Sequence, residues 1–261
     1  MTVLGDIAQG IFTGFLEAVA SVLVACHWLL AKVFPPDSGW TWAASLVALA
    51  VSVRVLLMPL SIYETRSLRA MQRMQPRIAV LQDEFGDDRK RLVQEQQNLW
   101  KESGTNPAVS CLPVVLQGFI LLNFLILFGP DGRVADGRSW VGGAAGESLA
   151  NASLFGDPVG ATFVDSTHVA TKLVSASIVV LVAACAFALR YQLTHQGMPP
   201  ETANFGPYGE QEKFLLVGLP IAWLIGGFVL PIGGLVFFAT WYLWALGEQS
   251  IVIRSDSPDG S

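Results

Sequence analysis

Five long apolar stretches restrict the folds that this sequence can adopt. They occupy residues 41–60, 109–128, 173–189, 214–230 and 232–247. Each is close to the roughly 17–25 apolar residues with which a helix crosses a bilayer, and Arg54 is the single formal charge among them. Charged residues make up 14% of the chain, against roughly 25% in an average soluble domain. The sequence therefore predicts an all-α polytopic membrane protein with five transmembrane helices.

The connections between the stretches complete the predicted organisation. An outer amphipathic helix precedes the spans, and a cytoplasmic helical hairpin joins the first two. In chain order the predicted segments are residues 1–34 (N-terminal amphipathic helix), 41–61 (first span), 62–107 (cytoplasmic hairpin), 108–128 (second span), 129–168 (extracellular loop), 169–191 (third span), 192–212 (cytoplasmic loop), 213–230 (fourth span), 232–253 (fifth span) and 254–261 (cytoplasmic tail). No internal repeat is visible, which disfavours the commonest transporter architectures.

The first 34 residues allow two interpretations. Apolar residues recur at helical spacing while Thr13, Glu17 and Ser21 lie off the apolar stripe, which is typical of a helix lying in the membrane interface. The alternative is a sixth span. The segment lacks the basic start of a signal peptide. Cys26 nevertheless ends a lipoprotein-like box, so lipid modification at Cys26 stays open.

Basic residues are concentrated between the first two spans. Residues 61–107 hold eight of the chain's 16 Lys and Arg residues, whereas residues 129–168 hold two, Arg133 and Arg138. Loops rich in Lys and Arg stay on the cytoplasmic side of a membrane. We therefore predict a multi-pass protein of the bacterial plasma membrane, with its N-terminus outside and its C-terminus in the cytoplasm.

The basic connection has the pattern of a helical hairpin. Its first helix carries an apolar seam that ends at Phe85, a turn follows at Gly86, and the second helix runs to Trp100. Four arginines step along the first helix by three or four residues and share one face: Arg66, Arg69, Arg73 and Arg77. This stripe is either a solvated face near anionic headgroups or a docking face for an acidic or RNA-containing partner such as a ribosome.

Arg54 lies inside the first span, slightly to the cytoplasmic side of its midpoint. Arginine at a helix centre costs roughly 2.5–3.5 kcal/mol on insertion scales. One interpretation is a side chain that extends to the cytoplasmic headgroups. The other is a water-filled cavity, open to the cytoplasm, in which Arg54 attracts an acidic group of a substrate chain. The cores of the five spans contain no Asp or Glu that would neutralise it.

Other polar or amphipathic side chains at membrane depth are Gln117 and Asn123 in the second span and Thr240, Trp241 and Trp244 in the fifth. Gln117 either hydrogen-bonds across the cavity or holds neighbouring helices together. Trp241 and Trp244 are also typical of the aromatic belt near a membrane surface. Together with Arg54, these residues form the predicted substrate groove.

The chemistry of the side chains disfavours several functions. The three histidines and three cysteines form no cluster with ligand spacing, and no catalytic serine motif or zinc motif is present. We therefore expect no enzyme activity, no metal and no cofactor. The formal net charge of −5 also disfavours a DNA-binding protein.

Several motifs occur in a characteristic order. An arginine in the first span is followed by Pro59-Leu60 and by the run Met71-Gln72-Arg73-Met74-Gln75-Pro76. Gly104-Thr105-Asn106-Pro107 then leads into Ser110-Cys111-Leu112-Pro113 and Gln117, and Pro231-Ile232-Gly233 opens the fifth span. These motifs resemble the YidC family of membrane protein insertases, particularly its short Gram-positive and actinobacterial members. The resemblance covers residues 35–255.

The resemblance implies a membrane protein insertase and chaperone. In such proteins a groove open to the cytoplasm and to lipid holds the arginine matched here by Arg54, and it transiently hosts a polar segment of the client. The implied partners are nascent membrane proteins and the lipid bilayer, with the ribosome and the Sec translocon as further candidates. Transfer of about 20 apolar client residues into lipid would drive the step.

The chain departs from the family pattern along the groove. Phe119 stands where the family often has proline, and Leu125-Ile126 where a tyrosine is common. Phe237-Phe238 replaces a Tyr-Trp pair, and Trp241-Tyr242 replaces a polar Thr/Ser-Asn pair. We therefore hypothesise a divergent member with a drier groove and a narrower client range. Two other functions stay open: a client-specific assembly factor, or a small anion transporter.

Overall fold

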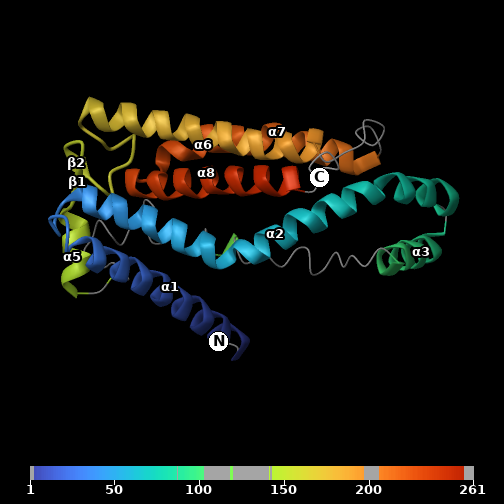
Figure 1. Cartoon of the computed structure of the whole chain (residues 1–261), viewed down its shortest axis with the longest axis horizontal. Helices are drawn as coiled ribbons and strands as arrows, with labels where there is room; N and C mark the ends of the chain where they lie inside the picture. The colour runs from blue at the N-terminus through green and yellow to red at the C-terminus, as the bar shows by residue number, and fades with distance from the viewer. Residues whose placement is uncertain are drawn as a thin grey trace. The chain divides into compact units, whose positions relative to one another are not determined.

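A computed structural model describes residues 3–86, 88–102, 118–119, 141, 143–196 and 206–255 of the chain. Its elements, in chain order, are α1 (Val3–Leu30), α2 (Gly39–Phe85), α3 (Arg89–Glu102), α5 (Gly143–Asn151), β1 (Ser153–Leu154), β2 (Asp157–Pro158), α6 (Val169–Gln196), α7 (Gly206–Gly226), the 3-10 helix η1 (Gly227–Val229) and α8 (Ile232–Ser255) (Figure 1). The predicted second span, residues 108–128, lies outside the described residues except for 118–119.

Long apolar helices characterise the described residues. Three of these helices are long and apolar enough to cross a membrane, through Thr13–Leu30 of α1, Gly39–Ser67 of α2 and Val169–Gln192 of α6, and a shorter apolar helix covers Leu216–Val229. Apart from one pair of two-residue strands, the secondary structure of these parts of the chain is helical. The predicted all-α membrane fold is confirmed at this level. The number of five spans and the interfacial position of residues 1–34 stay predictions.

The chain divides into two compact units. The first unit comprises Met1–Val55, Gly118–Ala183 and Ala222–Leu243, and the second comprises Leu56–Gln117, Ala184–Ile221 and Trp244–Ser261. In α2 the division follows Val55. The carbonyl of that residue lacks its usual helical donor because Pro59, four residues later, has no N–H.

In the first unit, the end of α1 packs against the start of α2. The His27 ring stacks on Trp42 with centroids 3.7 Å apart, and Ser45 Oγ lies 3.3 Å from His27 Nδ1. Trp42 Nε1 also donates to Ser148 Oγ of α5 at 3.2 Å. Because Trp42 is fully buried and its N–H is bonded, the ring stabilises this junction through its large apolar area. The helices α1, α2 and α5 therefore meet at one indole.

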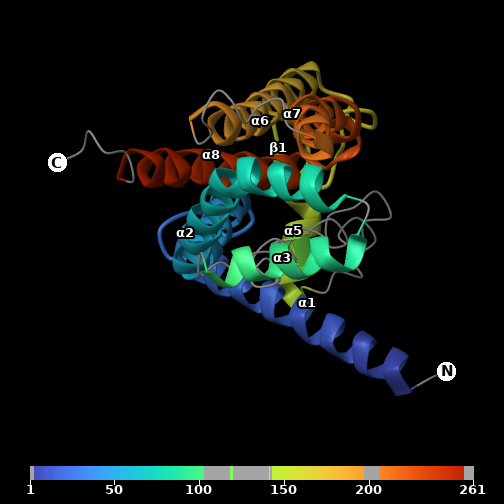
Figure 2. The ribbon, with the colours of Figure 1, turned by 90° about the vertical axis from the view of Figure 1, so that its right-hand side faces the viewer.

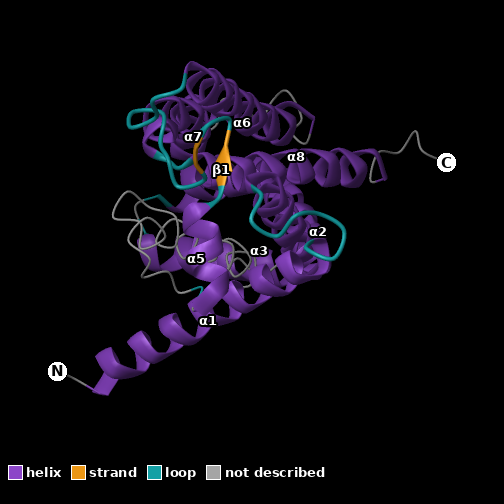
Figure 3. Cartoon of the chain, turned by 90° about the vertical axis from the view of Figure 1, so that its left-hand side faces the viewer, coloured by secondary structure: helices purple, strands orange, loops and turns teal. Residues whose placement is uncertain are grey.

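The residues after α5 form a short folded connection, whose strands are drawn orange in Figure 3. β1 and β2 pair antiparallel through a turn at Phe155 and Gly156, which have φ angles of 55° and 97°. The Asp157 carboxylate follows this turn and accepts hydrogen bonds from the backbone N–H groups of Thr167 and His168, at 3.2 and 3.1 Å. These bonds close residues 157–168 into a loop just before α6 begins.

The same connection is bonded to the beginning of α8. The N–H groups of Ile232 and Gly233 donate to the carbonyls of Ala161 and Val159, at 2.9 and 3.1 Å. A Cβ on Gly233 would lie 2.6 Å from Val159 Cγ1, which is closer than real side chains approach. Glycine is required here because the two backbones come so close together.

In the second unit, α2 ends at Phe85, a turn follows at Gly86, and α3 begins at Arg89 (Figure 2). Asp88 caps the new helix, because its Oδ1 accepts a hydrogen bond from the N–H of Arg91 at 3.1 Å. The local sequence thus both ends α2 and starts α3.

The division predicted between residues 61 and 62 falls inside α2. The helix continues because residues 60–75 contain neither glycine nor proline and are rich in good helix formers. Met74 and Ile78, which belong to the predicted apolar seam, are buried. One continuous helix therefore extends from the first apolar stretch into the basic region.

A polar seam joins α6 and α8 within the second unit. Gln249 Nε2 donates to the carbonyl of Leu189 at 2.9 Å, and Gln192 Nε2 donates to Ser250 Oγ at 3.1 Å. Hydrogen bonds between helices supply specific contacts where apolar burial offers little orientation in lipid.

Candidate functional site

Arg54 occupies the middle of the longest apolar helical segment among the described residues, Gly39–Ser67 of α2. From Gly39 to Ile62 the segment carries only apolar or small polar side chains besides Arg54, and the next charged residues, Glu64 and Arg66, lie near its end. The Arg54 side chain is only 5% exposed. A buried guanidinium at such a position is costly unless protein groups replace its water. The neighbours of Arg54 therefore decide what the site can do.

Trp241 of α8 supplies two contacts to Arg54. The Arg54 Cζ atom lies 4.0 Å from the centroid of the indole ring, and Arg54 Nη2 donates to the backbone carbonyl of Trp241 at 3.2 Å. Trp241 is 3% exposed, so the cation–π contact is shielded from water. Desolvated contacts of this kind are worth about 2 kcal/mol or more. Arg54 and Trp241 are thus predicted site residues that the structure brings together.

An aromatic cluster on α7 and α8 surrounds Trp241. Phe237 stacks on Trp241 with centroids 5.8 Å apart, and Phe238 contacts both Phe237 and Trp223 edge to face. Trp223 Nε1 donates to the hydroxyl of Tyr242 at 2.9 Å. We define these residues as the aromatic cluster: Trp223, Phe237, Phe238, Trp241 and Tyr242. Within this cluster, Trp241 contacts Arg54 directly.

Trp223 was not among the residues predicted for the site. In the sequence it is one aromatic residue in an apolar stretch, and nothing in its spacing links it to α8. Its single polar atom, the indole N–H, is a weak signal, because a buried tryptophan usually requires an acceptor. Only the folded chain identifies that acceptor as the Tyr242 hydroxyl.

The remaining predicted groove residues differ in their positions. Thr240 is half-buried, and its hydroxyl donates to the carbonyl of Val236 in its own helix at 2.9 Å. Trp244 is half-buried and belongs to the second unit. Gln117 and Asn123 lie outside the described residues. Among the predicted groove residues, the described structure thus places Trp241 directly against Arg54.

The basic stripe follows α2 within the second unit. Arg66 and Arg77 are exposed, while the side chains of Arg69 and Arg73 lie outside the described part of the structure. All four positions fall on the continuous helix, so the spacing of three and four residues keeps them on one helical face. Their role as a docking face stays a prediction.

One titratable group has a distinctive environment outside the apolar helices. Burial by itself would raise the pKa of Asp157. Hydrogen bonds from Thr171, from His168 and from the backbone N–H groups of residues 167 and 168 outweigh burial and hold that pKa well below its usual range. His168 Nδ1 lies 3.2 Å from Asp157 Oδ1. Asp157 is therefore a structural carboxylate, ionised at all ordinary pH values.

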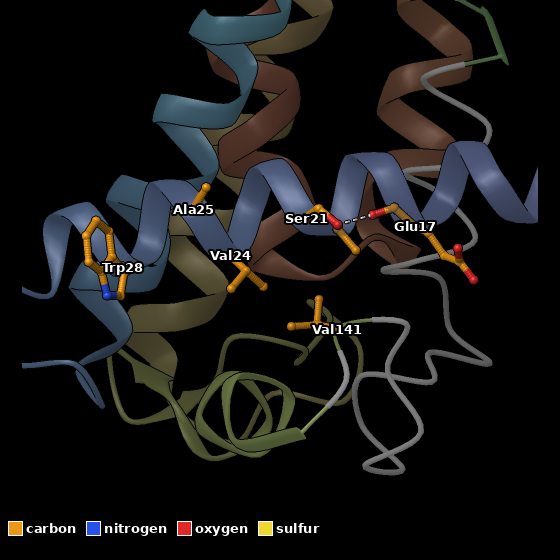
Figure 4. Close-up of a pocket in the computed structure, with 7 residues that line it drawn as sticks. Glu17, Ser21, Val24, Ala25, Trp28 and Val141 are labelled. Carbon is orange, nitrogen blue, oxygen red and sulfur yellow. Dashed lines mark hydrogen bonds between the residues drawn. The ribbon is translucent and has the colours of Figure 1, made fainter.

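A hollow of about 680 Å³ lies along α1, where Glu17, Ser21, Val24 and Trp28 line it together with Val141 (Figure 4). The Ser21 hydroxyl donates to the backbone carbonyl of Glu17 at 2.7 Å, so its hydrogen-bonding capacity is satisfied within the helix.

Among the described residues, no group of three His, Cys, Asp or Glu side chains lies close enough together to hold a metal ion.

Comparisons with known proteins add a family relationship. Residues 33–258 match the family described as 60Kd inner membrane protein. The chain is 34% identical over 269 aligned residues to the membrane protein insertase YidC of Streptomyces avermitilis, covering 98% of this chain and 61% of that protein. It is 27% identical to the YidC insertase of Mycobacterium leprae, covering 90% and 68% of the two chains. It is 25% identical to that of Tropheryma whipplei strain Twist, covering 98% and 87%.

Proposed function

Because the chain belongs to the 60Kd inner membrane protein family, the YidC family that its motifs resemble, we propose that this bacterial membrane protein inserts and chaperones nascent membrane proteins. The chain spans 61% of the length of its Streptomyces relative. The proposal therefore depends mainly on a feature of the chain itself. That feature is a buried arginine, Arg54, in the middle of an apolar helix.

In the proposed mechanism, Arg54 receives a short polar segment of the client. A guanidinium forms bidentate, charge-assisted hydrogen bonds with carboxylates, and these bonds are strongest where water is scarce. Arg54 would therefore lower the barrier for acidic client residues that must cross the membrane. The adjoining groove would consist of Gln117, Asn123, Thr240, Trp241 and Trp244.

Release of the client follows from apolar partitioning. A client helix of roughly 20 apolar residues gains about 25 cal/mol for each Å² that leaves water. No nucleotide hydrolysis is needed, since partitioning alone favours the inserted state. In this proposal the protein is not an enzyme and uses no cofactor.

The proposed orientation places the basic stripe in the cytoplasm, with the N-terminus outside and the C-terminus inside. Arg66, Arg69, Arg73 and Arg77 would then face the ribosome, the Sec translocon or anionic headgroups. Exposed arginines attract such partners over about a Debye length, so recruitment should weaken as salt rises.

Purified protein in liposomes tests the proposed function. The client would be a single-span protein with two aspartates in its short translocated segment, and insertion would be read by protection from added protease. We expect several-fold more protected client than in protein-free liposomes. Equal protection in both preparations would contradict insertase activity.

A crosslinking experiment in cells separates the insertase from a client-specific assembly factor. A photo-reactive residue at Thr240, beside Trp241, would crosslink many nascent membrane proteins if the chain is a general insertase. Crosslinks to one protein would favour the assembly factor. An anion transporter would crosslink no nascent chain at this position.

A further inference from the structure

The guanidinium of Arg54 is covered by a neutral ligand that belongs to the chain itself. Arg54 Cζ lies 4.0 Å from the Trp241 ring centroid, and Nη2 donates to the carbonyl of the same residue. Both side chains are buried, at 5% and 3% exposure. A client group cannot reach this face of the guanidinium while the indole is in place.

The two contacts differ in how easily a client could replace them. The carbonyl of Trp241 is part of the backbone of α8 and moves only with the helix. The indole can turn about two side-chain bonds, and among its neighbours it stacks on the ring of Phe237 with centroids 5.8 Å apart. The ring is therefore the replaceable part of the cover over Arg54.

We infer that Trp241 determines client specificity by competing with the client for Arg54, an inference that rests on the proposed insertase function. A carboxylate forms bidentate, charge-assisted hydrogen bonds with a guanidinium, whereas the indole offers Arg54 only the face of its ring. Acidic segments therefore displace the indole from Arg54. Neutral polar segments, whose amides and hydroxyls bind a guanidinium more weakly, leave the indole in place and gain little from Arg54.

The inference is tested with Trp241→Phe and Trp241→Leu in the liposome assay. Three clients are compared at limiting concentration, with two aspartates, two asparagines or no polar residue in the translocated segment. Tryptophan is the strongest cation–π partner and leucine has no aromatic face, so insertion of the aspartate client should rise from Trp to Phe to Leu, by about threefold or more overall. Insertion of the asparagine client should rise as well, and that of the apolar client should not change.

Two controls restrict the effect to competition at Arg54. In an Arg54→Ala background, Trp241→Leu should have no effect, because nothing is left to compete for. Trp28→Leu is the matched control, since Trp28 also covers a cation, Lys32, at 3.6 Å but is 60% exposed. It should leave the insertion of all three clients unchanged.

The direction in which Trp241→Leu changes the insertion of the aspartate client decides whether the inference holds. A fall in insertion of the aspartate client with correctly folded Trp241→Leu would show that the indole holds Arg54 ready for clients, which overturns competition. A gain that persists without Arg54 would overturn it too. If Trp241→Leu does not fold, Trp241→Phe decides, because an unchanged insertion rate with that variant contradicts the inference.

Failure of the inference and failure of the proposed function give different results. If the wild-type protein inserts none of the three clients, the proposed function is wrong. If it inserts the aspartate client in a manner that depends on Arg54, while the Trp241 variants behave as wild type, only the competition is wrong.

Discussion

The first unit contains the same type of contact in two environments. Lys32 lies 3.6 Å from the centroid of the Trp28 ring near the end of α1, and Arg54 lies 4.0 Å from that of Trp241. The first pair is exposed and the second is buried. Lys32 is exposed, whereas Arg54 is only 5% exposed and enclosed by protein groups. The cation–π contact of Lys32 therefore contributes little to stability, whereas that of Arg54 limits which groups can reach the guanidinium.

The difference shows that burial, rather than the pairing itself, gives the arginine its proposed role. An exposed cation–π contact is worth about 0.5–1 kcal/mol and is readily exchanged for water. A buried cation depends on its few neighbours, and its cost is retained only where it serves a purpose. The following predictions test this contrast, beginning with the largest expected effect.

Arg54→Leu should separate stability from function. We expect insertion of the aspartate client to fall tenfold or more, because the charge that receives the carboxylates is lost. The thermal midpoint in detergent should stay the same or rise, since leucine avoids the roughly 2.5–3.5 kcal/mol cost of a central arginine. Lys32→Leu, measured in parallel, should alter neither quantity. A large drop in the thermal midpoint of Arg54→Leu would instead assign Arg54 a structural role.

Asp157→Asn tests a polar group that is buried outside the apolar helices. Asparagine keeps the shape but weakens the bonds from Thr167 and His168, so we expect the thermal midpoint to fall by a few degrees. Asp165→Asn, at an exposed position of the same connection, is the control and should change the midpoint far less. Client insertion per folded molecule should be unchanged in both variants.

Lowering the pH should destabilise the folded chain through the same carboxylate, that of Asp157. Because the pKa of Asp157 is lower in the folded chain than in the unfolded chain, its stabilisation is fully present above the ordinary aspartate pKa of about 3.9. It is lost as the pH falls below that value. The gap between the thermal midpoints of wild type and Asp157→Asn should therefore narrow between pH 5 and pH 3. A gap that is constant over this range would contradict an ionised Asp157.

Trp28→Leu should have the smallest effect on stability. The indole and Lys32 are both exposed, so we expect a change within about 0.5 kcal/mol in the free energy of unfolding. If Trp28→Leu lowered the free energy of unfolding as much as truncation of a buried aromatic side chain does, the two cation–π pairs would not differ as argued.

The sequence predicted the helical membrane fold from apolar runs, and it singled out Arg54 as the one charge inside them. These predictions succeed because they depend on neighbours in the chain: a run of about 20 apolar residues can satisfy its backbone only as a helix in lipid. The continuation of one helix past residue 61 could not be predicted in the same way. Composition changes there, but residues 60–75 contain neither glycine nor proline, and the helix continues past Pro76 to Phe85.

The contacts of Arg54 could be predicted only in part. Trp241 was included for its depth in the fifth span, but its place over the guanidinium depends on how α2 and α8 pack, which neither segment encodes alone. The same holds for His27 on Trp42 and for Trp223 with Tyr242. Each pair joins residues from different helices, and tertiary packing determines such pairs.

The start of α8 is hydrogen-bonded to the connection after α5, and this determines how far along α8 Trp241 lies from that anchor. Ile232 is held by the carbonyl of Ala161, and Trp241 follows nine residues later. At a rise of about 1.5 Å per residue, Trp241 lies about 14 Å along the helix from Ile232. One residue inserted between these two positions would turn the indole by about 100° and remove it from Arg54. The hydrogen bonds between the connection after α5 and the start of α8 thus help to determine the position at which Trp241 meets Arg54.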